Sequence, residues 1–409
     1  MRKKVLHSMV STAAMRTPVI CAVARTPIGK YRGVFSELSA VDLGICAVKG
    51  LIENVGINSE STIIDEVLMG QVLQAGAGQN PARQVALGAG LPVSTPSTTI
   101  NKVCGSSLKS VMIASSAIRA GEYRAVIAGG MESMTNAPHI VRGYRRGDEV
   151  DSTSLIHSMV HDGLWDVYND MHMGNTGEVI ADECSISRKQ MDQFAVRSHK
   201  RAANARDNGW FEWEIVPVSI DTEDGVKEIR TDEGIRENSN IETLAELRSV
   251  FQKDGRITAG NASTLNDGAS AVLVADEEFA IEQGWPILAK IVDQCTSGVE
   301  PKRVMYAPIP AINTLLQRNE LEVMDIDVFE HNEAFASASC AIANEIGIPD
   351  DRFNLNGGAV SLGHPLGSSG TRCLITMLGI LRRIDGSKGI VSLCLGGGNA
   401  VAMLIERVE

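Results

Sequence analysis

Cys104 occupies a position suited to nucleophilic chemistry. A β-type run over residues 98–103 gives way there to the small residues 105–107, which are followed by apolar residues at helical spacing. The first amides of a helix are unpaired donors with partial positive charge, so we expect the Cys104 thiol to ionise more readily than that of a free cysteine. The alternative is a buried structural cysteine, because cysteine is among the most buried residue types.

Two further loops carry a histidine and a second cysteine. His364 lies between a glycine and a proline in a loop that leads into a helix, a rigid and accessible setting for a base near neutral pH. The alternative is a histidine satisfied in the core or at the surface. Cys394 ends a predicted strand, and at Gly396 a substrate can approach backbone amides, as in an oxyanion hole. For Gly397 and Gly398 a tight hairpin turn is the better interpretation.

Asn332 lies where a predicted strand, ending near Glu330, meets a predicted helix. Its amide could orient a water molecule or donate to a developing negative charge. An asparagine at this point could equally cap the helix. Asn332 therefore has a chemical role only if the fold brings it close to the other reactive residues.

Composition and charge narrow the class of protein. The 409 residues, 44% of them hydrophobic, suffice for two or three domains. A net charge of −12 and an aromatic content of 4% argue against nucleic acid as a partner, since most of the surface repels polyanions and stacking platforms are few. The eight cysteines form no CxxC pair or Cys/His cluster, which indicates neither a disulfide scaffold nor a zinc site. No apolar run is long enough to cross a bilayer, so no membrane partner is expected.

The first fourteen residues contain Arg2, Lys3 and Lys4 and no acidic residue. We interpret residues 1–14 as a disordered extension, because Met15 begins the first compact segment. No secretory hydrophobic region follows the opening charges, so we expect a reducing, cytoplasmic compartment. An organelle matrix is the alternative if residues 1–14 act as a targeting segment.

Strand-like and helical runs alternate through the first part of the chain, which argues for α/β layering with a mostly parallel sheet. The run 125–130 is continuously apolar, as expected of a strand covered on both faces. The predicted elements are strands at 18–24, 65–74 and 125–130 and helices at 41–55, 82–91 and 106–120.

From about residue 135 to 259 longer helices and more charge indicate an inserted domain. Its clearest helix begins with a capping box of Ser187 and Gln190 and stops near Gly209. Its basic residues suffice to dock a phosphate, although a charged helix face is usually just solvated. They are Arg188, Lys189, Arg197, Lys200, Arg201 and Arg206.

The remaining chain repeats the first layout, with a glycine-flanked reactive residue and a helix of small residues in each half. We therefore expect the reactive loops to meet across a pseudo-twofold interface. The predicted elements are strands at 271–275, 287–292 and 326–329, helices at 311–316, 333–346 and 370–381, and a final hairpin of 390–395 and 400–405.

Five segments together resemble the thiolase family: residues 101–107, 128–134, 332–336, 363–365 and 394–398. The resemblance covers the chain from about Met15 to its end. It implies the thiolase fold, which is α/β with five αβαβα layers from two similar halves and an inserted loop domain, and dimers that pair into a homotetramer. The implied units are a first half of residues 15–134 and 266–286, an inserted CoA-binding domain of residues 135–265, and a second half of residues 287–409.

The resemblance also assigns catalytic roles. Cys104 is the nucleophile that takes an acyl group, and His364 draws its proton. Cys394 exchanges a proton with the α-carbon of a second acetyl-CoA. The amides of Cys104 and Gly396 form one oxyanion hole, while His364 and a water held by Asn332 stabilise the enolate. No metal and no permanently bound cofactor is expected, because thiols and backbone dipoles supply the chemistry.

The implied reaction is the reversible condensation of two acetyl-CoA molecules to acetoacetyl-CoA and CoA. Ser263 is expected at the pantetheine arm and Arg236 near the adenine nucleotide, the alternatives being a plain turn residue and a solvated arginine. His172 and Met173 resemble the pocket wall of the biosynthetic, short-chain members, and Phe335 belongs to the same substrate-binding set. His172 is the main reason to expect acetoacetyl-CoA rather than a long 3-ketoacyl-CoA.

Two departures leave the acyl-chain limit and the tolerance of a 2-methyl branch open. The run 304–308 is bulkier than in the biosynthetic members, and Asn175 and Gly177 are unusual in their run. A degradative 3-ketoacyl-CoA thiolase of broader chain length is therefore the main alternative.

Three other classes of protein are disfavoured. A β-ketoacyl synthase would carry a histidine where Cys394 stands, and a noncatalytic thiolase-fold lipid-binding protein would not need all four reactive residues. A dinucleotide-binding dehydrogenase is disfavoured because the glycines at 396–398 do not complete a GxGxxG motif.

Overall fold

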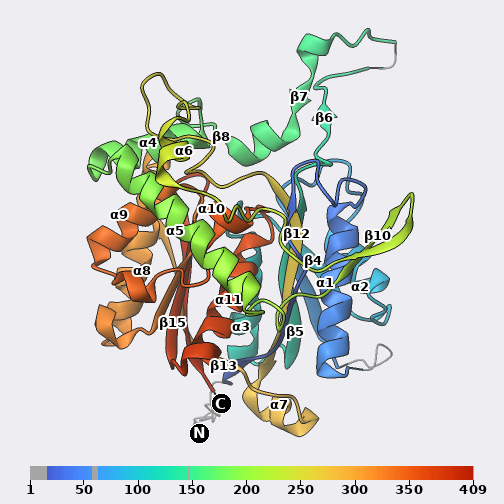
Figure 1. Ribbon diagram of the computed structural model, residues 1–409. Coiled ribbons are helices and arrows are strands. Elements are labelled where there is room, and N and C mark those ends of the chain that lie inside the picture. Colours follow the sequence, from blue (N-terminus) through green and yellow to red (C-terminus); the bar gives the residue numbers. More distant parts are fainter. Residues whose placement is uncertain (1–15, 58–62, 146, 409) are drawn as a thin grey trace, which may run out of the picture.

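The structure, a computed structural model, describes residues 16–57, 63–145 and 147–408. Its central feature is a ten-stranded sheet in the order β14-β15-β16-β13-β1-β12-β5-β3-β4, with β2 beside β12 (Figure 1). The predicted extension of residues 1–14 lies outside the described residues. The strands are β1 (Pro18–Arg25), β2 (Gly29–Lys30), β3 (Glu66–Gly70), β4 (Ser97–Ile100), β5 (Ala125–Ser133), β12 (Asn266–Asp276), β13 (Ala289–Gly298), β14 (Val328–His331), β15 (Lys388–Leu395) and β16 (Asn399–Arg407).

The sheet is mixed, so the prediction of a mostly parallel sheet is wrong. Among the described strands, the pairs β3–β4, β3–β5 and β14–β15 are parallel. The remaining pairs, including β1–β13, which joins the two half-sheets, are antiparallel. A strand covered by helices on both faces is continuously apolar whatever its direction, so the apolar run 125–130 could not reveal the mixture.

Helices cover both faces of each half-sheet, which confirms five layers (Figure 1). Helices α1 and α2 lie outside the first half, α8 and α9 lie outside the second, and α3 and α11 lie between the halves. Three clusters of buried apolar side chains fill the spaces between these layers. No helix in the described ranges is long and apolar enough to cross a membrane. The bounds are α1 (Ala40–Val55), α2 (Pro81–Gly88), α3 (Ser106–Arg119), α7 (Glu277–Gln283), α8 (Pro308–Arg318), α9 (Ala336–Ile346), α10 (Ala359–Leu362) and α11 (Ser369–Ile384).

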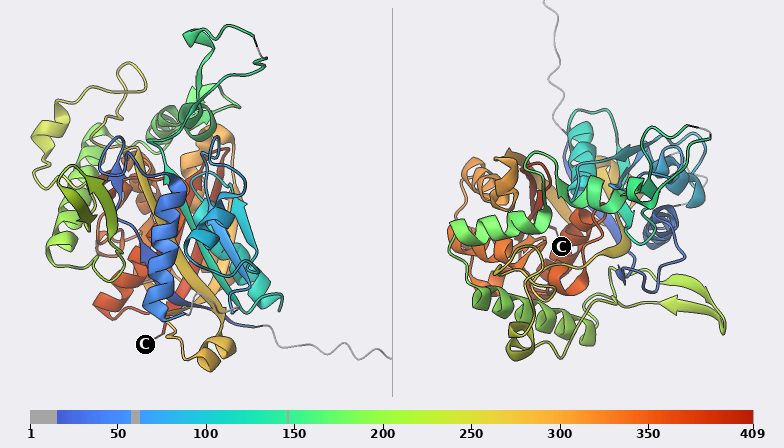
Figure 2. Two further views of the ribbon diagram at one scale, coloured as in Figure 1. Left: turned by 90° about the vertical axis from the view of Figure 1, so that its right-hand side faces the viewer. Right: turned by 90° about the horizontal axis from the view of Figure 1, so that it is seen from above.

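Between β5 and β12 the chain leaves the sheet, and β12 then returns between β1 and β5. Figure 2 shows that an arm with β6 and β7 and a hairpin of β10 and β11 project from the body. The predicted capping box is confirmed, since the Ser187 and Gln190 side chains each accept the other's backbone N–H. The elements are β6 (His139–Ile140), β7 (Ile156–His157), β8 (Trp165–Asp166), β9 (Met171–His172), α4 (Met173–Glu183), α5 (Arg188–Asp207), β10 (Val218–Thr222), β11 (Gly225–Ile229) and α6 (Ile241–Ala245).

A buried ion triad attaches this excursion to the first half-sheet. Arg25 of β1 donates from Nε to Glu214 at 2.6 Å, and from its two terminal nitrogens to Asp232 at 2.7 and 3.0 Å. All three side chains are buried. Because buried charges require partners, the triad fixes the segment around residues 214–232 against β1.

Replacing Arg25 by Met should strongly lower the urea midpoint of unfolding, measured by circular dichroism. The buried carboxylates of Glu214 and Asp232 then lose their counter-charge, and breaking one side of a buried pair costs about 3 to 5 kcal/mol. The control is Arg230→Met, which removes only an exposed pair with Glu228 and should leave the midpoint nearly unchanged. Equally small shifts in both variants would contradict the stabilising role of the triad.

Candidate active site

A cavity of about 600 Å³ collects the predicted reactive residues. Cys104, His364, Cys394 and Gly396 line it, from the loops before α3 and before α11 and from the end of β15. Asn332 is not among the lining residues, but its side chain contacts His364, which is. The cavity is also lined by the predicted substrate-binding residues His172, Met173, Arg236, Ser263 and Phe335.

A tight turn presents Cys104 to the cavity. Val103 has a φ of +48°, a left-handed conformation that a β-branched residue rarely adopts. The N–H groups of Gly105 and Ser106 donate to the carbonyls of Lys102 and Val103 at 3.1 and 3.0 Å. Strain of this kind persists only where the surrounding structure enforces it, so the position of Cys104 is imposed by the fold.

Burial disfavours the ionised form of both cavity thiols. Burial raises the pKa of Cys104 well above its ordinary value and the neighbouring Cys394 raises it further, while the N–H groups of Cys104 and Gly396 act in the opposite direction. Burial likewise raises the pKa of Cys394 to about 12. The prediction that the start of α3 favours the Cys104 thiolate is therefore wrong, because desolvation outweighs the nearby amides.

His364 is buried, not accessible as predicted. Its Nδ1 lies 2.6 Å from Ser369 Oγ, and that hydroxyl donates to the Pro365 carbonyl at 2.9 Å. Because the hydroxyl proton is engaged, Ser369 accepts from the ring, so Nδ1 carries the hydrogen and Nε2 the lone pair. Burial lowers the pKa of His364 to about 3. The imidazole is therefore neutral, with Nε2 able to take a proton.

Asn332 follows β14 and faces His364. Its Nδ2 lies 3.4 Å from His364 Nε2. Its Oδ1 is buried and has no hydrogen-bond partner among the described residues. Helix α9 begins at Ala336 with Phe335 at its N-cap, so the capping alternative for Asn332 is wrong. A buried amide oxygen without a protein partner is suited to binding a water molecule.

A glycine turn between β15 and β16 completes the reactive centre. Gly397 and Gly398 have φ values of +84° and +78°, which confirms the predicted hairpin turn. Gly396 precedes the turn, and its backbone N–H interacts with the sulfur of Cys104. The turn thus supplies a donor beside the nucleophile, while Cys394 lies at the end of the strand.

Phe251 is a cavity residue that the sequence did not reveal. Its ring stacks on His172 with the centroids 4.7 Å apart and meets Phe335 edge-on at 6.0 Å. Phe251 lies in a polar stretch with no periodic signal, so only its contacts identify it. The apolar lining also includes Met134, Met159, Leu164, Met305 and Leu366.

The arginines of α5 are engaged with carboxylates, so a charged surface describes this helix better than a phosphate site. Arg236 differs from them because it lines the cavity. The ion pairs join Arg188 to Asp192, Arg197 and Arg201 to Asp350, and Arg206 to Asp207 and Glu237.

Known proteins share this architecture. The crystal structure of a Bacillus anthracis acetyl-CoA acetyltransferase superposes with a TM-score of 0.93 at 35% identity, covering 97% of this chain and 100% of that one. The structure of human mitochondrial 3-ketoacyl-CoA thiolase superposes with a TM-score of 0.92 at 36% identity and the same coverage.

Similarity in sequence is as extensive. An acetyl-CoA acetyltransferase of Cupriavidus necator is 45% identical over 96% of this chain and 100% of its own length. A probable acetyl-CoA acyltransferase of Staphylococcus aureus is 46% identical over 97% of this chain and 100% of its own length. The thiolase N-terminal domain matches residues 18–278 and the thiolase C-terminal domain residues 285–407. With both domains present and the reactive loops meeting in one cavity, the chain belongs to the thiolase family.

Proposed function

We propose that the chain catalyses the reversible condensation of two acetyl-CoA molecules to acetoacetyl-CoA and CoA through an acetyl group on Cys104. The proposal is carried by the meeting of Cys104, His364 and Cys394 in one cavity, with the Gly396 N–H beside the Cys104 sulfur. A nucleophile that can hold an acyl group, together with a base and a second thiol that can move protons, is suited to joining two thioesters. Two of the similar proteins are named acetyl-CoA acetyltransferases.

In the first half-reaction the Cys104 proton passes to His364 Nε2, and the sulfur attacks the thioester carbonyl of acetyl-CoA. The oxyanion accepts from the N–H groups of Cys104 and Gly396. The departing CoA sulfur takes the proton of Cys394, which leaves acetyl-Cys104, a protonated His364 and a Cys394 thiolate. The two buried charges form together, and a buried pair costs less than an isolated thiolate.

In the second half-reaction the Cys394 thiolate takes a proton from the α-carbon of the second acetyl-CoA. The enolate oxygen accepts from the His364 Nε2–H and from a water held by the free Oδ1 of Asn332. The enolate carbon attacks the acetyl carbonyl, a C–C bond forms and the C–S bond to Cys104 breaks. His364 returns its proton to Cys104, so every group regains its starting state. Thiolysis is the reverse sequence.

We further propose that CoA binds across the excursion between β5 and β12. Arg236 and Ser263 line the same cavity as Cys104 and belong to this excursion. The backbone N–H of Arg236 donates to Nδ1 of His199 at 3.1 Å, which attaches its segment to α5. The proposed units are a first half of residues 15–134 and 266–286, a CoA-binding region of residues 135–265 and a second half of residues 287–409.

We also propose a homotetramer, built as a dimer of dimers, in a reducing cytoplasmic compartment. The arm between β6 and β7 exposes Tyr144, Val150 and Leu155, apolar side chains suited to contact with another copy. All eight cysteines lie within the described residues, and all are free thiols, as expected of a reducing environment. An organelle matrix is the alternative if residues 1–14 act as a targeting segment.

Brief mixing with acetyl-CoA should add one acetyl group to Cys104. The Cys394→Ala variant should also be acetylated, because the protonated His364 can supply the proton for the departing CoA sulfur in place of Cys394. Its condensation rate should fall by at least about 100-fold because it lacks the base for the α-carbon. Intact-protein and peptide mass spectrometry locate the label, and Cys104→Ala is the unlabelled control. An unlabelled wild type, or a label on another cysteine, would refute the mechanism.

Alkylation of Cys104 by iodoacetamide should accelerate steadily with pH in the ligand-free protein. Only the thiolate reacts, and a raised pKa keeps it scarce, so the rate should rise about tenfold per pH unit between about pH 7 and pH 9. The urea-unfolded protein is the control. Its alkylation rate should level off near the ordinary cysteine pKa of about 8.5. If the rate in the folded protein instead levels off at a pH below about 8.5, the nearby amides lower the pKa of Cys104 by more than burial raises it.

The thiolysis kcat/KM should fall at least roughly tenfold from acetoacetyl-CoA to long 3-ketoacyl-CoAs. The physical reason is the fixed ring of His172, which stacks on Phe251 and accepts the Gly174 N–H at 3.0 Å. The measurement is a series of thiolysis rates that includes 2-methyl-branched substrates. The His172→Ala variant should have a higher kcat/KM than wild type on the longer chains. Equal rates on long chains would favour the degradative alternative.

A further inference from the structure

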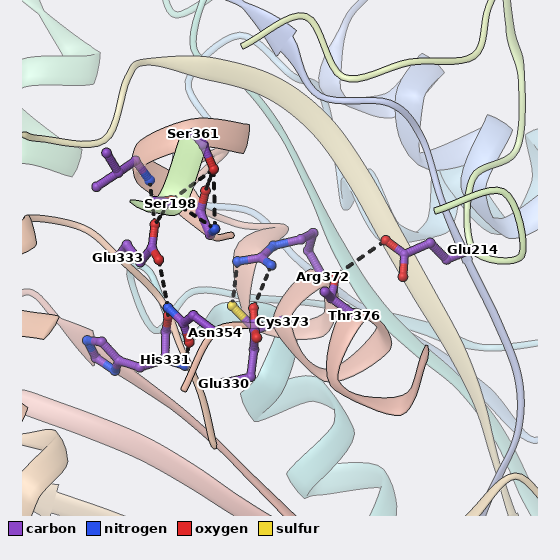
Figure 3. A network of polar contacts seen from close by, with 12 residues as sticks. Ser198, Glu214, Glu330, His331, Glu333, Asn354, Ser361, Arg372, Cys373 and Thr376 are labelled. Carbon is purple, nitrogen blue, oxygen red and sulfur yellow. Dashed lines mark hydrogen bonds and ion pairs between the residues drawn. The ribbon is translucent and has the colours of Figure 1, made fainter. Parts of the chain in front are cut away.

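Glu333 directly follows Asn332 and has no part in the chemistry described above. Its side chain is buried. Its Oε2 accepts hydrogen bonds from Ser198 Oγ at 2.7 Å and from the Val360 N–H at 3.1 Å, and its Oε1 accepts from Asn354 Nδ2 at 2.8 Å (Figure 3). A buried carboxylate with three donors is a rigid junction, because losing any donor leaves a buried charge poorly satisfied.

Asn354 extends this junction to the end of β14. Its Oδ1 accepts the His331 N–H at 2.7 Å, and its Nδ2 donates to the His331 carbonyl at 2.9 Å. Its φ of +48° is a conformation that these bonds maintain. Through Asn354 and Glu333, the chain is therefore held on both sides of Asn332.

The other donors connect Glu333 to α5 and α10. Ser198 belongs to α5 and Val360 to α10. A Cβ on Gly358 would lie 2.4 Å from the Glu333 carboxyl carbon, so the carboxylate fits only against a glycine here. Ser198 Oγ also accepts the Gly358 N–H at 3.2 Å. Glu333 is thus packed against the segment that leads to His364.

His364 has anchors of its own, which do not involve Glu333. Its N–H donates to Asn266 Oδ1 at 3.0 Å, and its Nδ1 is paired with Ser369 Oγ. Among the described residues, the Asn332 side chain has only its 3.4 Å contact with His364 as a hydrogen bond. If the hydrogen bonds to the Glu333 carboxylate are weakened, the Asn332 side chain should shift while His364 stays in place.

We propose that Glu333 is a positioning residue that holds the Asn332 amide against His364 for the second half-reaction. This inference rests on the proposed function, in which acylation of Cys104 uses His364 but not Asn332. Loss of the Glu333 carboxylate should therefore slow condensation and spare acylation. A residue that only stabilised the fold would affect both half-reactions alike.

The test is Glu333→Gln, which keeps the size of the side chain but turns one acceptor into a donor facing other donors. The rate of Cys104 acetylation, measured by rapid quench and mass spectrometry, should stay within about threefold of wild type. The kcat for condensation should fall about 10 to 100-fold, less than the loss of a direct oxyanion donor, with KM little changed. Equal losses in both half-reactions, or an unchanged condensation rate, would overturn the inference.

Glu214→Gln is the matched control. Glu214 is an equally buried carboxylate that accepts from Thr376 Oγ1 of α11 at 3.3 Å (Figure 3). It also binds Arg25 of β1, so these two partners belong to a strand and a helix and not to the loops of Cys104 and His364. This variant should keep the wild-type ratio of the two rates even if it is less stable.

Ser198→Ala removes one of the three donors and should give a smaller loss in the same half-reaction. If Glu333→Gln does not fold, Ser198→Ala provides the test in its place. An equal loss of rate in both half-reactions, or no loss of rate, would then overturn the inference. A wild type that is not acetylated on Cys104 would instead refute the proposed function, and this inference with it.

Discussion

The close packing of α3 against α11 between the two half-sheets is the constraint on which the rest of the structure depends. A Cβ on Gly370 of α11 would lie 2.6 Å from the backbone nitrogen of Leu108 in α3, so the helices can approach this closely only with glycine there. Because the two helices begin side by side, the loops that precede them reach the same end of the sheet. These loops carry Cys104 and His364, which explains how residues so distant in sequence share one cavity.

Strand direction completes the arrangement. β14 and β15 are parallel neighbours, so Asn332 and Cys394 emerge from the same edge of the second half-sheet. Each reactive residue therefore stands at the end of a secondary-structure element that is itself buried between layers. Catalytic groups held in this way lose little entropy when substrate binds, because the fold has already fixed their positions.

Burial of the cavity determines how the site can work. An isolated thiolate or imidazolium is disfavoured there, as the raised pKa values of Cys104 and Cys394 and the lowered pKa of His364 indicate. Charge separation becomes favourable only when proton transfer produces opposite charges together and backbone donors receive the oxyanion. The same reasoning applies to the carboxylates around the site, such as Glu333, whose burial requires several donors.

The sequence by itself determined the features that depend on neighbours along the chain. These include the capping box at Ser187, the hairpin turn at 397–398 and the four residue types that carry the proposed chemistry. It could not determine strand direction, because buried strands look alike in parallel and antiparallel sheets. It also misjudged the ionisation of Cys104 and missed Phe251 beside His172. Only the tertiary structure decided these points, because desolvation and ring packing depend on segments that meet in space and not along the chain.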